Sequence, residues 1–275
     1  MKKRAVLVGI NDYAGNPLAG PVNDVALMSE FLRDRCGFSV DTEIVSATQM
    51  AGTKSAILER LQWLVRGAEP QDQLLFHFSG HGDQLDASDD AGELDRLDEV
   101  LCALGFDRTN ATAIRDDELT ALFSTLPRGA HVVWTCDSCH AGGMPPASAR
   151  GGPPAAEDRT ARGWSAAAAP EPRSARANDR RRAERRMRRA MGELPVVFIG
   201  ACAEGQRAYE GPLGGRVHGA LTYHLVRELE QPGGLTTSLA RIVDGATRAM
   251  NRAGYAQEAV LVTPREREAA PLFWP

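Results

Sequence analysis

Short apolar runs alternate with longer amphipathic segments along most of the chain. Runs such as LLF and VVW contain no alternating polar residues, which indicates strands that are buried on both faces. Buried strands are predicted at residues 4–10, 39–45, 72–80, 130–137 and 194–202, with a last strand at either 259–264 or 271–275.

Between these runs, apolar residues recur three and four positions apart, as in helices that cover one face of a sheet. Helices are predicted at residues 23–37, 53–68, 116–126, 218–231 and 236–254. Thr53 is a suitable N-cap for the second of them. Strands that alternate with such helices imply an α/β fold, with a mainly parallel sheet and helices on both faces.

Two of the predicted strands end in residues that could carry chemistry. In a parallel sheet, the carboxyl ends of the strands share one rim, where ligands usually bind. The strand at 72–80 leads into His81, in the motif SGHG, and the strand at 130–137 leads into Cys139, in DSCHAGG. A thiolate beside an imidazole is a nucleophile with its acid/base group. The adjacent glycines would let a substrate approach the backbone amides.

The same letters permit a second interpretation. Cys136, Cys139 and His140 spell C-x-x-C-H, the attachment motif of c-type haem, and C-x-x-C alone occurs in redox and zinc sites. A haem protein of this type predicts an export signal and a distal axial ligand, neither of which is evident. A zinc site needs a further Cys/His pair at ligand spacing, which the sequence lacks.

Composition is that of an ordinary soluble protein, with 43% hydrophobic and 25% charged residues in a chain of 275. The apolar stretch after the basic start MKKR is too short for a signal-peptide core, and no run approaches the length of a membrane span. Five cysteines, an odd number, argue against a disulfide framework. We therefore expect a reduced, cytoplasmic protein that does not contact a membrane.

Residues 144–193 differ from the rest of the chain. They are rich in Pro, Ala, Gly and Arg, and the first two thirds lack apolar periodicity, so we expect a flexible linker. Residues 150–189 contain twelve arginines and five acidic residues, whereas the whole chain has a net charge of -4. A basic segment in an acidic protein could bind nucleic acid, act as a solvated tail, or be cut by a protease.

The segments LLFHFSGHGDQ and DSCHAGG, with the histidine 58 residues before the cysteine, resemble the caspase-like cysteine peptidases, in particular the metacaspase and prokaryotic caspase branch. LAGPVNDVALM, LDEVLCALGFD and GRVHGALTYHLVREL extend the similarity over most of the chain. The resemblance implies a caspase-like three-layer sandwich with about six strands. It divides this single domain into a large-subunit-like half (1–143), the linker (144–193) and a small-subunit-like half (194–275).

The resemblance also implies a cysteine endopeptidase. Cys139 is then the nucleophile, His81 the general acid/base, and the amides of Gly82 and Cys139 the oxyanion hole. In metacaspases an acidic S1 pocket binds an Arg or Lys at P1, the residue before the scissile bond. Three positions match that pocket here: Asp24, Ser79 and Asp137.

Asp24 could instead be a helix N-cap. Asp137 has a separate rationale, because a carboxylate beside the nucleophile is costly unless a cation is its partner. The family often has a cysteine three residues before the first aspartate, where this chain has Pro21.

No cofactor is expected to be required, although many metacaspases need calcium. Residues 83–99 include eight acidic side chains, whose oxygens suit Ca²⁺, but no EF-hand spacing is present. By resemblance Asp98, Asp116 and Asp117 match family calcium ligands, whereas Pro146 replaces a fourth acid. A solvated acidic loop is the alternative.

For the linker, the resemblance favours activation by cleavage over nucleic-acid binding, because this segment separates the two subunits of caspase-like chains. The candidate scissile residues are Arg182, Arg186 and Arg189. The chain would cut itself there or be cut by an upstream protease. The expected partners are protein or peptide substrates with Arg or Lys at P1. The rival hypothesis is a catalytically silent caspase-like scaffold.

Overall fold

A six-stranded sheet forms the centre of the computed structural model, in the order β12-β9-β7-β3-β1-β2. Neighbouring strands are parallel except for β12, which runs antiparallel to β9. The strands are β1 (Lys3–Gly9), β2 (Glu43–Ser46), β3 (Gln73–Ser79), β7 (His131–Asp137), β9 (Val196–Gly200) and β12 (Val260–Val262). The structure describes residues 1–38, 43–46, 52–86, 97–139, 159–164, 194–203 and 206–273.

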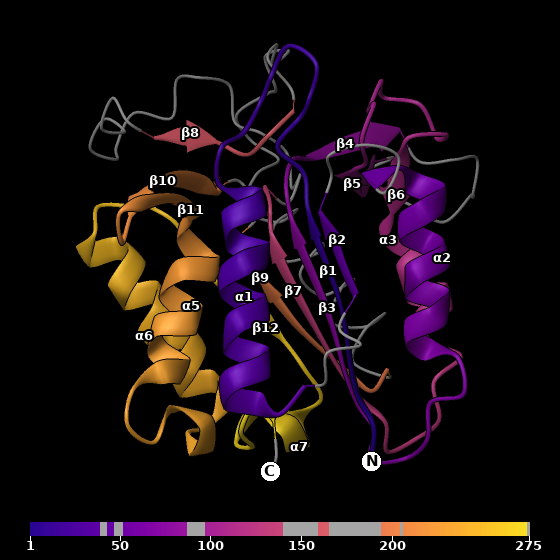
Figure 1. Cartoon of the computed structure of the whole chain (residues 1–275), viewed down its shortest axis with the longest axis vertical. Helices are drawn as coiled ribbons and strands as arrows, with labels where there is room; N and C mark the ends of the chain where they lie inside the picture. Colours follow the sequence, from indigo (N-terminus) through magenta and orange to yellow (C-terminus); the bar gives the residue numbers. More distant parts are fainter. Residues whose placement is uncertain are drawn as a thin grey trace, which may run out of the picture.

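Helices cover both faces of this sheet (Figure 1). Successive side chains of a strand point to opposite faces, so Val6 and Val8 of β1 join one hydrophobic core, whereas Ala5 and Leu7 join the other. The first core includes α2 (Lys54–Val65) and α3 (Asp116–Phe123), and the second includes α1 (Pro21–Cys36), α5 (Ala220–Glu230) and α6 (Leu239–Arg252).

The predicted α/β fold with helices on both faces is confirmed. The last strand is β12, so the alternative at residues 271–275 is wrong: Leu272 and Phe273 are buried in the second core without forming a strand. No helix in the described part of the chain is both long enough and apolar enough to span a bilayer.

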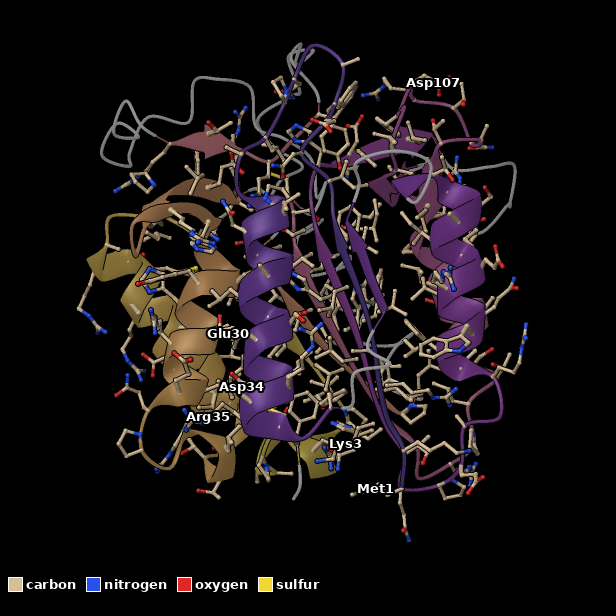
Figure 2. All side chains as sticks on the ribbon, viewed as in Figure 1. Met1, Lys3, Glu30, Asp34, Arg35 and Asp107 are labelled. Carbon is tan, nitrogen blue, oxygen red and sulfur yellow. The ribbon has the colours of Figure 1, made fainter. Side chains whose placement is uncertain are left out.

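Local sequence explains where the helices begin and end. Thr53 is the N-cap of α2, as predicted, and its hydroxyl accepts a hydrogen bond from the amide of Ala56. Helix α1 ends at Gly37, which adopts a left-handed φ of 69° that favours glycine. The Lys3 ammonium donates to the carbonyl of Cys36, 2.7 Å away, and Figure 2 shows Lys3 beside this end of α1.

Two small sheets that the hydrophobic pattern does not predict lie at the carboxyl ends of β1, β3 and β7 (Figure 1). One contains β4 (Gly82–Asp86), β5 (Leu97–Cys102) and β6 (Ala113–Arg115). The other contains β8 (Thr160–Ala161), β10 (Tyr209–Leu213) and β11 (Arg216–Gly219). The remaining short helices are η2 (Gly234–Thr236) and α7 (Arg265–Glu268). Both small sheets flank the rim at which the predicted site lies.

Two buried histidines make stability depend on pH. Burial lowers the pKa of His77 and of His131 to about 4, from an ordinary value near 6.5. A pKa lowered by folding means that the unfolded chain binds protons more readily between pH 6.5 and 4. The contribution of these histidines to the free energy of unfolding should therefore be at its maximum above pH 6.5. It should fall by about 1 kcal/mol per pH unit for each histidine as the pH drops toward 4.

Urea denaturation at half-unit steps from pH 7 to 4.5 would measure this slope. His77→Gln and His131→Gln should each make the slope shallower by removing the contribution of the replaced histidine. An unchanged slope in both variants would contradict the assignment.

Candidate active site

Cys139 and His81 lie on one rim of the sheet, as the strand ends predict. Strands β3 and β7 are adjacent and in register, with Ser79 opposite Asp137. His81 follows Ser79 by two positions, and Cys139 follows Asp137 by two positions. Both side chains are buried, with 4% of Cys139 and none of His81 exposed. The structure thus brings the two residues together from positions 58 residues apart in the sequence.

A backbone carbonyl from the linker lies against the predicted oxyanion hole. The amides of Gly82 and Cys139 donate to the carbonyl oxygen of Arg162, over 3.2 and 3.4 Å. A Cβ on Gly82 would overlap the carbonyl of Cys139, so only glycine fits at this position. Two amides that converge on one oxygen are what stabilisation of an oxyanion requires.

The side chain of the same residue fills an acidic pocket. Nη2 of Arg162 lies 2.8 Å from Asp24 and 3.2 Å from Glu210, and no part of the side chain is exposed. Nη1 donates to the Ser79 hydroxyl over 2.7 Å and lies 3.3 Å from the Asp137 carboxylate. A planar guanidinium with several donors matches such a ring of oxygens.

All three predicted S1 residues therefore surround one guanidinium. The N-cap alternative for Asp24 is wrong, because α1 begins at Pro21 and Gly20 occupies the cap position. The Asp24 carboxylate instead accepts hydrogen bonds from the amide of Gly219 and from Nδ1 of His218.

Sequence reasoning missed Glu210, which comes from β10 and also accepts hydrogen bonds from the amides of Ala19 and Gly20. Its signal is the segment AYEGPL, which carries an acid in a stretch otherwise short of charge.

Gly20 and Gly219 line the acidic pocket, and their lack of a side chain leaves just enough space for the guanidinium of Arg162. A Cβ added to Gly20 would lie 2.6 Å from Nη2 of Arg162, and one added to Gly219 would lie 2.5 Å from Nη1. A larger residue at either position would therefore displace the arginine.

Three carboxylates share one buried cation, and the pKa values of Asp24 and Asp137 shift in opposite directions. Burial would raise the pKa of Asp24, but Arg162 and hydrogen bonds from His218 and Ser79 hold it below its usual range. Burial raises the pKa of Asp137, and the charge of Asp24 adds to that effect against the opposing Arg162. Burial opposes the charge on Arg162, but the three carboxylates raise its pKa above its usual value. The pocket is built to hold a positive charge.

His81 is oriented by the loop that precedes α1. Its Nε2 lies 2.8 Å from the carbonyl of Asn16, which can only accept, so Nε2 carries the hydrogen. Nδ1 is buried and has no hydrogen-bond partner among the described residues. Burial lowers the pKa of His81. The imidazole is thus neutral, with Nδ1 free to accept a proton.

The Cys139 thiol is also neutral in this state. Its Sγ accepts a hydrogen bond from the amide of Ala208 over 3.3 Å and lies 3.7 Å from the Ala208 carbonyl. Burial raises the pKa of the thiol to about 11. Loss of contact with water, in a side chain that belongs to the second hydrophobic core, is the main cause of this shift.

The two cysteines of the C-x-x-C motif do not form a pair. Cys136 belongs to the core beneath α2 and α3, whereas Cys139 belongs to the core on the opposite face of the sheet. All five cysteines are free and buried. His140 lies outside the described residues. This placement contradicts the haem, redox and zinc interpretations, which need both sulfurs at one site.

The candidate calcium ligands are only partly within the described part of the chain. Asp116 and Asp117 open α3, and an Asp116 oxygen accepts from the amide of Asp117. Asp98 lies in β5, but its side chain is outside the described residues, as is Pro146. Among the side chains that are described, no three His, Cys, Asp or Glu residues are grouped to hold a metal ion. Calcium binding stays a prediction from resemblance.

Arg182, Arg186 and Arg189, the candidate scissile residues, lie outside the described residues. The linker arginine that the structure places in the site is Arg162. Residues 159–164 fall in the range expected to be flexible, yet they cross the rim in an extended conformation, and β8 pairs with β10.

Known proteins resemble this chain in sequence and in fold. A family model described as metacaspase, peptidase C14 domain, matches residues 3–147. The chain belongs to the metacaspase family. Metacaspase-1 of Candida albicans is 40% identical over 154 residues, which cover 52% of this chain and 34% of that protein. Metacaspase-1 of Yarrowia lipolytica is 40% identical over 149 residues, or 51% of this metacaspase and 32% of the relative. The chain therefore aligns with about a third of the length of these relatives.

Solved structures show the fold over nearly the whole metacaspase chain. Protein GSU0716 from Geobacter sulfurreducens superposes with a TM-score of 0.65 at 20% identity, over 98% of this chain and 97% of that one. Caspase-1 from Spodoptera frugiperda superposes with a TM-score of 0.55 at 13% identity, over 96% and 87%. The predicted caspase-like fold is thus confirmed.

Proposed function

We propose that this metacaspase is a cysteine endopeptidase that cleaves after arginine and processes its own linker. The observation that carries the proposal is the position of Arg162. Its guanidinium is buried among Asp24, Asp137 and Glu210, and its carbonyl oxygen accepts from the amides of Gly82 and Cys139. A residue held by both its charge and its carbonyl has the placement of a P1 arginine.

In the proposed mechanism, Nδ1 of His81 takes the proton of the Cys139 thiol, and Sγ attacks the P1 carbonyl carbon. The C–S bond forms as the carbonyl becomes an oxyanion, which the amides of Gly82 and Cys139 stabilise. The oxyanion collapses, the C–N bond breaks, and His81 returns the proton to the leaving amine. Water, deprotonated by His81, then hydrolyses the thioester and restores the thiol.

Arginine should be preferred to lysine at P1. The guanidinium contacts Ser79, Asp24 and Glu210 from two different nitrogens. A lysine ammonium has one nitrogen and cannot reproduce that fork, so it would leave a buried oxygen without a partner. Lysine substrates should bind, but less well.

The proposed self-processing site is the bond between Arg162 and Gly163. This bond follows the carbonyl that lies between the two amides, and Gly163 bridges to Gly82 on the far side. The neutral thiol and imidazole suit a latent form in which the chain's own segment covers the site. An upstream protease that cuts within residues 144–193 is the alternative route to activation.

Three fluorogenic peptides that differ only in Arg, Lys or Asp at P1 would test the proposal on the full chain. Because a lysine ammonium makes fewer of the hydrogen bonds that the two guanidinium nitrogens make, we expect the arginine peptide to be cleaved about tenfold faster than the lysine peptide. Aspartate should not be cleaved, because it would face three carboxylates. Parallel assays with Ca²⁺ and with a chelator test the metal prediction. Absence of turnover on all three, with and without Ca²⁺, would favour the silent scaffold.

A further inference from the structure

The segment Arg159–Trp164 binds along the rim on both sides of the Arg162–Gly163 bond. Before the bond, Ala161 pairs antiparallel with Tyr209 of β10, and the amide of Arg162 donates to Ala208 over 3.0 Å. After it, the amide of Trp164 donates to the carbonyl of Gly82 over 3.2 Å. Such backbone pairing holds an extended peptide and presents its side chains to separate pockets.

Trp164, two residues after the bond, lies in an aromatic pocket. Its ring meets those of Tyr13, His81 and Phe106 in edge-to-face geometry, with centroids 5.8, 5.8 and 5.3 Å away. This is the favoured arrangement for aromatic pairs, and it contributes beyond the area buried. The Asn16 side chain donates to the carbonyl of Gly163 over 3.4 Å, which fixes the backbone leading into the pocket.

Arg159, three residues before Arg162, binds the C-terminal end of α6. Its guanidinium donates to the carbonyl of Ala253, 2.8 Å away, and to that of Gly254. Its Cζ lies 4.3 Å from the centroid of the Tyr255 ring. Helix C-terminal carbonyls carry partial negative charge, and an aromatic face attracts a cation. A Cβ on Gly254 would come within 2.9 Å of the guanidinium, so glycine leaves the space for it.

The side chain of Thr160, which lies between Arg159 and Arg162, differs from those of both arginines. Thr160 is exposed, and its pairing with Glu210 in β10 is a backbone interaction that any residue could make. Recognition by side chains should therefore be concentrated at the two ends of the segment and at Arg162.

We infer that the site has two further subsites: one for arginine at P4, formed by Ala253, Gly254 and Tyr255, and one for an aromatic residue at P2′, formed by Tyr13, His81 and Phe106. The inference rests on the proposed function and extends it to the class of substrate. Preferred proteins carry an arginine at P4, an arginine at P1 and an aromatic residue at P2′ in an exposed extended segment.

The test uses internally quenched peptides and the full chain. The parent is Arg-Thr-Ala-Arg-Gly-Trp, and three relatives carry Ala in place of the P4 Arg, of the P2′ Trp, or of both. A fourth, with Ala in place of the P3 Thr, is the matched control. Each loss should lower kcat/KM by about tenfold and the double loss by about a hundredfold, because the two subsites do not share residues. The control should match the parent. The chain's own segment competes equally with every peptide, so the ratios do not depend on it.

A minimal peptide ending in an Arg–coumarin amide separates failure of this inference from failure of the proposed function. If it is cleaved and all five quenched peptides react alike, the subsites are wrong and the peptidase stands. If no peptide is cleaved, the proposed function itself fails.

Two variants give a crossed readout that a folding defect would not produce. Phe106→Leu should weaken the preference for Trp at P2′ and leave the preference for Arg at P4 unchanged. Tyr255→Leu should do the reverse. Equal loss of both preferences in either variant would overturn the assignment of residues to subsites.

Discussion

Replacing Cys139 by alanine is expected to lower peptide hydrolysis by about a thousandfold or more and to abolish self-cleavage, because the sulfur that forms the thioester in the proposed mechanism is then absent. The pocket around Arg162 does not include the Cys139 side chain, but the uncut linker still fills that pocket in this variant, so an added arginine peptide should bind only weakly. Initial rates with an Arg-ending fluorogenic peptide, together with gel electrophoresis of the chain after incubation, would measure hydrolysis and self-cleavage separately.

Cys136→Ala is the matched control. Its thiol lies only three residues away in the sequence but in the opposite core, 3.1 Å from the Ser138 hydroxyl. The substitution should cost about 1 kcal/mol of stability and leave turnover in place. Full activity in Cys139→Ala, or loss of activity in Cys136→Ala alone, would sink the proposed mechanism.

Arg162→Ala is expected to stop cleavage of the linker at residue 162 and to destabilise the uncleaved chain. Removing one partner of a buried ion pair costs about 3–5 kcal/mol, because the remaining charges stay buried without compensation. Here Asp24, Asp137 and Glu210 all lose their common cation. Mass spectrometry of the new termini and urea denaturation would measure the two effects.

The triple variant with alanine at Arg182, Arg186 and Arg189 is the control for this experiment. It removes the arginines that the sequence favoured as scissile residues and keeps Arg162. Fragments 1–162 and 163–275 should still appear. If the triple variant stays intact and Arg162→Ala is still cut, the proposed bond is the wrong one.

The sequence was sufficient to predict the sheet and the pair of side chains at its rim. Strands such as β3 and β7 are buried on both faces, so their apolar runs stand out, and the residues that follow them must lie at the same edge. Helices α2 and α6 could also be predicted, because their apolar residues recur three and four positions apart and form one buried face. Asp24, Ser79 and Asp137 were located through resemblance, since only the fold brings them around one cation.

What could not be predicted depends on pairing between distant segments. Strand β8 has two residues, and among the described strands it pairs with β10, about fifty positions later. Little in the local sequence distinguishes Arg162 from the other arginines of a basic segment, apart from Trp164 two residues later, which is the one tryptophan in residues 144–193. In the sequence Glu210 is one of many acidic residues, and only the position of β10 in the folded chain places it at the pocket. Strands β4, β5 and β6 lie in an acidic stretch whose charges hide their pattern.

The pairing of β8 with β10 has a kinetic consequence. A segment tethered in the same chain occupies the site at an effective concentration on the order of millimolar, which a dilute external substrate cannot match. Under the proposed function, outside substrates gain access only after the segment has been cut and has dissociated. The onset of peptide hydrolysis should then show a lag whose length does not depend on the concentration of the enzyme.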